Sequence, residues 1–312
     1  PGYLSAAPAH TSLANQQMLY EFTGVSSHAA ASPERGRSAL DALTLMNTGV
    51  QFLREHVPTS TRIHYAVLNT GGVSPNVVQA EASAMYLIRT PSVEDLDAMV
   101  ERVNKVARGA AMMTETEVKI TFNKSCANVI PNKPLSHALS QNLAEMPLPE
   151  YTQEEIAYAQ RMRDTIPAKG DMLTSQAEKL GGKMAAFAAQ HAKDPIYNFV
   201  IPEIPVTIAT SSSTDVGDVS WVCPTSQVQI CTMCASTGGH TWQRTAQGKS
   251  ALAHKGMLYA GRVLAGTAID LLTQPELVAA AHEEWEKQLH GRIYRPMPAE
   301  VVPTGLEAIV VE

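Results

Sequence analysis

Four polar residues stand at positions where chemistry could take place. His28 lies in the small-residue loop GVSSHAAASP, where a side chain can be exposed and a ligand can approach the backbone closely. Arg89 ends the segment AEASAMYLIR, and Asn76 precedes it by 13 residues, after a Gly-Gly turn. An arginine at a strand end can bind both oxygens of a carboxylate. His240 follows an apolar run in a second Gly-Gly turn, so its imidazole could face a cleft.

Each of these residues also has an ordinary structural role open to it. A lone loop histidine such as His28 is often a solvated surface residue. Arg89 could form a surface ion pair with Glu81 or Glu94. His240 alone does not make a metal site, because zinc normally takes at least three protein ligands. The residue types therefore leave both interpretations open.

Two further groups could belong to a metal or redox site. Cys231 and Cys234 form a C-x-x-C pair, which can bind zinc or carry redox chemistry. They lie in an apparent strand, where residues three apart point to opposite faces, and there is no second C-x-x-C, so we interpret them as core cysteines. Asp215 and Asp218 could orient a metal-bound histidine or serve as loop and cap residues.

The elements that must position His28, Asn76 and Arg89 lie within residues 13–122. Alternation of apolar and polar residues predicts strands at 13–22, 62–69, 80–89 and 117–122. Helical spacing predicts one helix that follows an N-cap at Ser32-Pro33, and another that Ser92 caps together with Asp95. The order βαββαβ is the ferredoxin-like split motif, a four-stranded antiparallel sheet with two helices on one face.

The remainder of the chain has a different pattern. Helices are expected at about 152–164, 174–191, 248–272 and 275–289, and a buried strand at 228–235. The core contacts expected of the long helix are Leu252, Tyr259, Val263 and Ile269. Strands and helices together indicate an α/β layer, but too few strands are visible to complete a sheet. Either this domain is small or its first half is absent.

The composition indicates a globular protein that binds small molecules. The chain has 312 residues, 45% of them hydrophobic, which is enough for two domains with cores. Its formal charge of −6, with dispersed basic residues, argues against nucleic acid as a partner. No apolar run approaches the roughly 18 residues of a membrane span, and four cysteines in so long a chain are untypical of a secreted domain. We therefore expect a cytoplasmic protein without a membrane partner.

Three stretches, taken in order, carry a family resemblance. They are GVSSHAAASPERGRSALDA, NTGGVSPNVVQAEASAMYLIR, and STDVGDVSW with GGHTWQ and ALAHKGM downstream. Together they resemble the aminoacylase and carboxypeptidase superfamily of co-catalytic metallohydrolases, over nearly the whole chain. The resemblance implies an inserted ferredoxin-like lid and dimerisation domain at 13–128. It also implies a zinc-peptidase-like α/β catalytic domain, represented by a remnant at 1–12 and a C-terminal part at 129–312.

The resemblance also implies roles for the candidate residues. His28 would reach into the partner subunit's site and stabilise an oxyanion, while Asn76 and Arg89 would bind the substrate's carboxylate. His240 would ligate one of two divalent metal ions, zinc or manganese. The other ligands and a general-base glutamate would lie upstream of Pro1, so we expect this chain alone not to assemble the metal pair.

The function that the resemblance implies is metal-dependent hydrolysis of the amide bond of an N-acyl amino acid. The first expectation is p-aminobenzoyl-glutamate, cleaved to p-aminobenzoate and glutamate by a homodimer joined through the lid, alone or with a homologous second subunit. One alternative keeps the family and changes the substrate to a dipeptide or another N-acyl amino acid. Another is a non-catalytic dimerisation or scaffold fragment that lacks the metal site.

Overall fold

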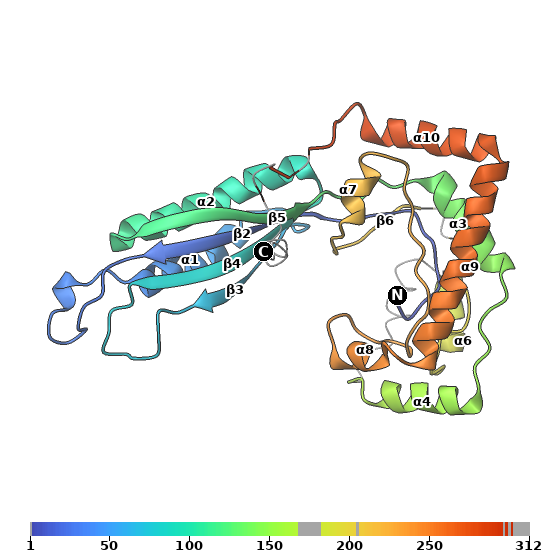
Figure 1. The fold of residues 1–312 in the computed structure, drawn as a ribbon, viewed down its shortest axis with the longest axis horizontal. Helices are drawn as coiled ribbons and strands as arrows, with labels where there is room; N and C mark the ends of the chain where they lie inside the picture. Colours follow the sequence, from blue (N-terminus) through green and yellow to red (C-terminus); the bar gives the residue numbers. More distant parts are fainter. Residues whose placement is uncertain (1, 168–181, 204–205, 296, 299–300, 302–312) are drawn as a thin grey trace, which may run out of the picture. The chain divides into compact units, whose positions relative to one another are not determined.

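The computed structural model describes residues 2–167, 182–203, 206–295, 297–298 and 301. The chain divides into two compact units, whose elements are drawn in Figure 1. Unit 1 comprises Pro1–His10, Pro131–Ile208 and Pro224–His290, and unit 2 comprises Thr11–Ile130, Ala209–Cys223 and Gly291–Glu312.

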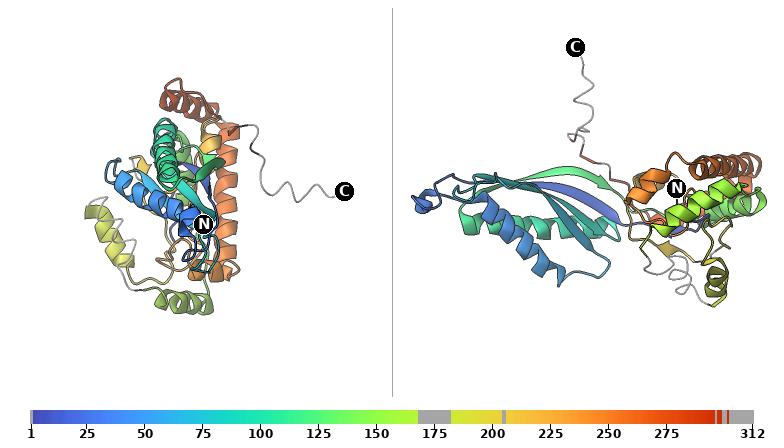
Figure 2. Two further views of the ribbon diagram at one scale, coloured as in Figure 1. Left: turned by 90° about the vertical axis from the view of Figure 1, so that its left-hand side faces the viewer. Right: turned by 90° about the horizontal axis from the view of Figure 1, so that it is seen from below.

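Unit 2 is built on one four-stranded antiparallel sheet. Its strands are β2 (Ala14–Thr23), β3 (Arg62–Asn69), β4 (Glu81–Thr90) and β5 (Glu117–Cys126), in the order β3-β4-β2-β5. Two helices, α1 (Ala39–Arg54) and α2 (Val93–Thr114), cover one face of the sheet (Figure 2). The predicted βαββαβ motif and its mixed α/β class are confirmed.

The period of two in each strand decides which residues face the helices. In β4 the buried residues Ala82, Ala84, Tyr86 and Ile88 pack under α1 and α2. The residues between them, which include Arg89, lie on the opposite, open face of the sheet. The hydroxyl of the buried Tyr86 has a hydrogen-bond partner, because it donates to the Asn47 side chain at 2.5 Å.

The two helices of unit 2 begin at serine caps. Ser92 caps α2 as predicted, accepting a hydrogen bond from the Asp95 N–H at 3.2 Å. The predicted start of α1 at Ser32-Pro33 is wrong, because these residues lead into a short 3-10 helix, η1 (Pro33–Arg35). Backbone bonds between Val25 and Arg37 close this loop before the α-helix starts. Ser38 then provides the cap, accepting from the Asp41 N–H at 3.0 Å.

Unit 1 is mainly helical. Its described helices are α3 (Lys133–Glu145), α4 (Gln153–Asp164), α6 (Gly182–His191), α8 (Trp242–Gln247), α9 (Ala251–Thr273) and α10 (Pro275–Leu289). The prediction omitted α3, which begins at an Asn132 cap. Residues 174–181 of the predicted second helix lie outside the described residues. Strand β1 (His10–Thr11) pairs with β6 (Ile208–Ala209) in a two-stranded ladder. Helix α7 (Val216–Ser220) belongs to unit 2.

The predicted strand at 228–235 is the second correction. This segment is buried, as its apolar residues indicated, but it makes only isolated bridges, between Ala6 and Gln229 and between Gly2 and Cys231. Side chains replace the missing ladder partners: the Ser5 hydroxyl accepts the Cys231 N–H at 3.1 Å, and Gln247 accepts the Cys234 N–H at 2.7 Å. Apolar composition predicted the burial of residues 230–235 correctly, but the backbone bonds of the segment to Gly2 and Ala6 form separate bridges rather than a continuous strand.

The long helix α9 supplies the third correction. Leu252, Tyr259 and Val263 are buried as predicted, but Ile269 is 60% exposed. The buried positions of α9 recur every three or four residues, and Ile269 falls about a third of a turn away from that row. None of the described helices combines the length and the hydropathy that a membrane crossing needs.

Candidate functional site

His28 lies in the exposed loop that follows β2. Its backbone bridges to Val77, and its ring nitrogen Nδ1 accepts hydrogen bonds from the N–H groups of Ala30 at 3.2 Å and Ala31 at 3.1 Å. A nitrogen that accepts two N–H groups carries no proton, so this geometry assigns the ring proton to Nε2. The imidazole therefore presents an Nε2–H donor on an exposed side chain, held in orientation by its own loop.

Asn76 belongs to the same loop cluster as His28. The Asn76 carbonyl accepts a hydrogen bond from the Ala29 N–H at 2.9 Å, and the Val78 N–H donates to the Ser27 carbonyl at 2.9 Å. The β3–β4 connection reaches this position through a turn at Gly71, whose φ of 79° favours glycine. A Cβ added at Gly71 would lie only 2.4 Å from the Glu81 carbonyl oxygen. Backbone bonds thus hold Asn76 and His28 together.

Arg89 lies at the carboxyl end of β4, on the open face, and is half-buried. Its nearest side-chain partner is the Ser213 hydroxyl, 3.5 Å from Nη1. Neither carboxylate considered as an ordinary partner pairs with Arg89: Glu94 pairs with Arg292 at 3.6 Å, and Glu81 lies at the other end of β4, eight residues away. Among the described residues Arg89 forms no ion pair, so its guanidinium retains donors for a ligand carboxylate.

The structure separates Arg89 from the other two candidates of unit 2. Asn76 and His28 adjoin the end of the sheet where Thr23 pairs with Glu81, whereas Arg89 pairs with Asn15 near the opposite end. At about 3.3 Å per residue, Glu81 and Arg89 are roughly 26 Å apart along the strand. A single small substrate bound to one copy of unit 2 cannot contact both ends. Asn76 and Arg89 of one chain therefore lie too far apart to hold one carboxylate together, and a carboxylate held by both would have to lie between two protomers.

His240 lies in unit 1, exposed, with a positive φ of 55° just before the Thr241 cap of α8. The described residues contain no group of three or more His, Cys, Asp or Glu side chains placed to hold a metal ion. His240 is thus a single donor within the part of the chain that the structure describes. A complete metal site would need ligands from outside that part.

The cysteine pair and the acidic pair have structural positions. Cys231 and Cys234 are buried in the core of unit 1, and burial raises the pKa of the Cys231 thiol to about 11. In unit 2, Asp218 accepts hydrogen bonds from the Ala127 N–H and the Tyr294 hydroxyl, both at 3.2 Å. Asp215 occupies the N-cap position of α7 without a side-chain cap bond. These contacts favour core and loop roles.

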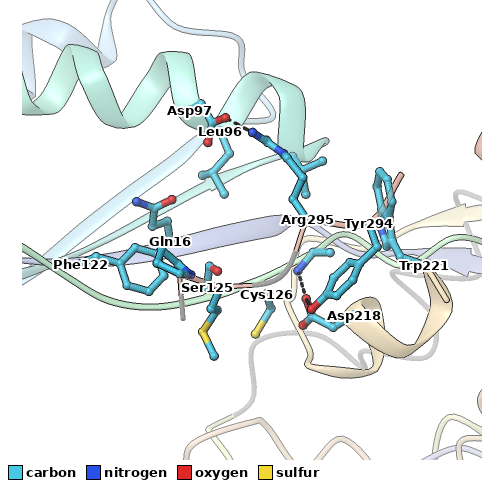
Figure 3. Close-up of a pocket in the computed structure, with 14 residues that line it drawn as sticks. Gln16, Leu96, Asp97, Phe122, Ser125, Cys126, Asp218, Trp221, Tyr294 and Arg295 are labelled. Atoms are coloured by element: carbon cyan, nitrogen blue, oxygen red, sulfur yellow. Dashed lines mark hydrogen bonds and ion pairs between the residues drawn. The ribbon is translucent and has the colours of Figure 1, made fainter. Parts of the chain in front are cut away.

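A cavity of about 290 Å³ lies in unit 2, and of the candidate residues only Asp218 lines it. Figure 3 shows the segment after Gly291 closing one side of it. In that segment Arg295 pairs with Asp97 at 2.8 Å and the Tyr294 hydroxyl reaches Asp218. His28, Asn76 and Arg89 are not among the residues that line the cavity. The cavity is therefore distinct from the candidate site.

Ser213 is the site neighbour that the sequence prediction missed. It belongs to the hydroxyl-rich run Thr210–Thr214, which is far from Arg89 in sequence and meets it only in the fold. The run of consecutive serines and threonines was the available signal, because hydroxyl groups can donate to an anion beside a guanidinium. Only the fold shows which strand end this run approaches.

Comparisons with known proteins give a family match for part of the chain and several similar proteins. Residues 16–112 match the family described as the peptidase dimerisation domain, from β2 to the last turn of α2. A p-aminobenzoyl-glutamate hydrolase subunit of Escherichia coli (strain K12) is 41% identical over 298 residues, which cover 95% of this chain and 62% of that protein. Xaa-Arg dipeptidase of Mus musculus is 27% identical over 278 residues, which cover 89% of this chain and 52% of that protein. Among solved structures, aminopeptidase PepT from Bacillus cereus ATCC 10987 aligns over 91% of this chain and 55% of that chain, at 12% identity and a TM-score of 0.42.

The sheet and helices of unit 2 are thus those of a peptidase dimerisation domain. These two matches support the resemblance of the chain to the aminoacylase and carboxypeptidase superfamily. The E. coli protein is similar to nearly the whole length of this chain. The chain itself spans 62% of that relative and 52% of the mouse dipeptidase.

Proposed function

We propose that the protein is a metal-dependent amidohydrolase that releases a free amino acid from an N-acyl amino acid, with p-aminobenzoyl-glutamate as the first substrate. The observation that carries this proposal is the half-buried Arg89, which has no carboxylate partner among the described residues. Its setting in a peptidase dimerisation domain, and 41% identity to the E. coli hydrolase, support the reaction and substrate class.

Arg89 would bind the α-carboxylate of the substrate. A guanidinium engages both oxygens of a carboxylate through two parallel N–H donors, which fixes the orientation as well as the position of the amino acid. Ser213 leaves one guanidinium nitrogen in a weak, 3.5 Å contact that a carboxylate can replace. This role places the scissile amide at a constant distance from Arg89.

His28 would stabilise the oxyanion that forms when water attacks the amide carbonyl. The two N–H groups of Ala30 and Ala31 occupy Nδ1, so the donor at Nε2 is oriented before substrate binds. A preorganised donor of this kind commonly lowers the barrier by about 3 kcal/mol. Asn76, bonded to the same loop, would supply a second polar group beside it.

His28 and Asn76 would act in the site of a partner subunit, and Arg89 in the site of its own. The roughly 26 Å between the two ends of the sheet excludes a single shared substrate within one copy. A dimer joined through the dimerisation domain would bring the loop cluster of one protomer to the Arg89 side of the other. Each complete site would then need two chains.

The metal ions belong to the intact enzyme, and the described residues do not form their site. His240 is the one ligand that the family resemblance assigns to this chain, and no cluster of three donors surrounds it among those residues. Two zinc or manganese ions, when bound, would activate the attacking water. The chain's own described residues contribute substrate binding and oxyanion stabilisation.

Release of glutamate from p-aminobenzoyl-glutamate tests the proposal. The full-length gene product, supplied with Zn²⁺ or Mn²⁺, is expected to release p-aminobenzoate and glutamate in equal amounts, as measured by chromatography. A panel of dipeptides and other N-acyl amino acids covers the alternative substrates within the family. Failure with every member of the panel, by a folded and metal-loaded dimer, would leave the non-catalytic scaffold as the explanation.

Partner and location are part of the same proposal. The homodimer through unit 2 is the assembly we propose, and a homologous second subunit is an alternative, which the description of the E. coli relative as one subunit of a hydrolase supports. We propose the cytoplasm as the location, because a chain of this length with few, unevenly spaced cysteines favours a reducing compartment.

A further inference from the structure

One face of helix α9 in unit 1 is apolar and uncovered. Its large exposed side chains are Met257, Leu258, Leu264, Ile269 and Leu272, which are 61%, 60%, 52%, 60% and 85% exposed. Gly261, Ala265 and Ala268 fill the exposed positions between them, and Arg262 is the only charged residue exposed between Met257 and Leu272. We call these exposed residues the α9 stripe. It is about 24 Å long at 1.5 Å per residue.

The other face of α9 already has partners. Tyr259 and Val263 pack on Leu139 and Leu143 of α3, and the Tyr259 hydroxyl donates to the Leu143 carbonyl at 2.7 Å. Near the start of the helix, a Cβ added at Gly256 would lie 2.4 Å from the Cys231 carbonyl oxygen. A helix that is apolar on two opposite faces normally lies between two layers of protein. Within the described residues only one of these layers is present.

The side-chain sizes in the α9 stripe favour close packing against protein. Gly261 has nothing within 4 Å of an added Cβ, so the surface is open there. Glycine and alanine between large residues form a shallow groove in which ridges of a neighbouring element can lie. An exposed apolar surface of this continuity is typical of an interface rather than of a free monomer surface.

We propose that the α9 stripe is the docking surface for a further layer of polypeptide, equivalent to the part of the E. coli relative that lies outside its match to this chain. That relative is 41% identical over 95% of this chain, so it includes the α9 region, and more than a third of its own length lies outside the match. The mouse dipeptidase has nearly half of its length outside the match. Among its described residues, unit 1 offers only three small, separate apolar clusters, and this layer would join them to a larger core.

A second copy of the chain fits the α9 stripe less well. Unit 2 already provides a dimerisation domain. A second self-associating surface on unit 1 would favour larger or open assemblies rather than a closed dimer. The single charge at Arg262 also offers no complementary pair for a symmetric contact between two identical stripes.

Thiol labelling of single cysteine substitutions tests the proposal. Ile269→Cys lies in the α9 stripe, and Glu283→Cys is the matched control on the exposed side of α10. Both are made in this chain and at the aligned positions of the intact E. coli relative, and maleimide labelling of each is measured under native conditions against the parent protein. In this chain the two positions should label at similar rates. In the intact relative, position 269 should label at least about tenfold more slowly than position 283, because a covering layer must open first.

Two results would overturn the proposal. Equal labelling of both positions in the intact relative would mean that nothing covers the stripe. Protection of Ile269→Cys in this chain alone, increasing with protein concentration, would assign the stripe to a second copy instead. The labelling does not depend on catalysis, so its outcome is separate from that of the hydrolysis assay.

Discussion

At the scale of single residues, chemistry depends on which donors remain available. Arg89 and Arg62 pair across β4 and β3 on the same open face, yet their surroundings differ. Arg62 donates to backbone carbonyls of its own loop, including Thr61 at 2.8 Å, whereas Arg89 has only the weak Ser213 contact. The availability of donors distinguishes a candidate substrate anchor from an arginine that stabilises a loop.

We expect Arg89→Lys to weaken substrate binding strongly. Lysine keeps the charge and loses the planar pair of donors, so KM for a carboxylate substrate should rise by about tenfold or more while the free energy of unfolding changes little. Steady-state kinetics and a denaturant titration measure the two quantities. Arg62→Lys is the matched control and should leave KM unchanged; equal effects of the two substitutions would contradict the assignment.

We expect His28→Ala to reduce kcat by about a hundredfold or more, with a smaller change in KM, because the lost donor acts on the oxyanion rather than on the bound substrate. His28→Gln keeps an N–H donor on a side chain of similar reach and should recover part of kcat. The kcat values of the two variants, measured on the full-length dimer, test whether His28 acts as a hydrogen-bond donor. Equal losses in both would argue against a donor role for His28.

Burial of the Cys231 thiol predicts a pH-dependent reactivity. With a pKa of about 11, roughly one Cys231 in a thousand is a thiolate at pH 8, so alkylation should be slow there and accelerate as the pH rises toward 11. The exposed Cys223 should react readily at pH 8. Mass spectrometry of iodoacetamide-treated protein separates the two sites. Rapid alkylation of Cys231 at pH 8 in the folded protein would show that the site is accessible and ionised.

At the scale of elements, local sequence signals define the strands and helices of unit 2 and thereby position its loops. Alternating apolar residues place Tyr20 and Tyr86 under the helices, where their rings meet edge to face at 5.3 Å. The same alternation places Arg89 on the open face. Serine caps then fix where each helix begins, and thereby the lengths of the loops that contain His28 and Asn76.

We expect Ser92→Ala and Ser38→Ala each to lower the free energy of unfolding by about 1 kcal/mol, because each side chain satisfies a helix N–H that would otherwise lack a partner. Denaturant titration of the purified protein measures this change. Ser32→Ala is the matched control, since Ser32 makes no side-chain cap bond to η1. A loss at Ser32 as large as that at Ser38 would contradict the observed start of α1.

At the scale of the whole molecule, the length of the sheet decides how sites can be assembled. Backbone bonds join His28 and Asn76 at one end, and Arg89 stands at the other. If each site takes the loop cluster from one protomer and Arg89 from the other, the three residues fall into two groups that mixing experiments can separate.

We expect mixed dimers of His28→Ala and Arg89→Ala subunits to regain activity. One of the two sites in each mixed dimer is then intact, so random mixing of two inactive variants should restore about a quarter of the wild-type kcat. Mixing His28→Ala with Asn76→Ala is the control and should restore none, because both residues enter the same site from the same protomer. Rescue in the control, or no rescue by His28→Ala and Arg89→Ala in verified mixed dimers, would contradict the shared site.

The sequence by itself determined the architecture of unit 2 and the identity of its candidate residues. Strand alternation, helical spacing and the Ser92 cap are local signals, and each reappears in the structure. The order of motifs around His28 and Arg89 supplied the family, which the comparisons support independently.

Only the tertiary structure decided the relations between distant segments. It showed that Asn76 and Arg89 lie toward opposite ends of the sheet of unit 2 and that Ser213 meets Arg89. It also showed that the run at 228–235 forms two isolated bridges, to Gly2 and Ala6, rather than a strand. It also turned Ile269 from an expected core residue into part of an exposed stripe. Periodicity along a chain reports that a face is apolar, whereas the element that covers the face depends on contacts between segments far apart in sequence.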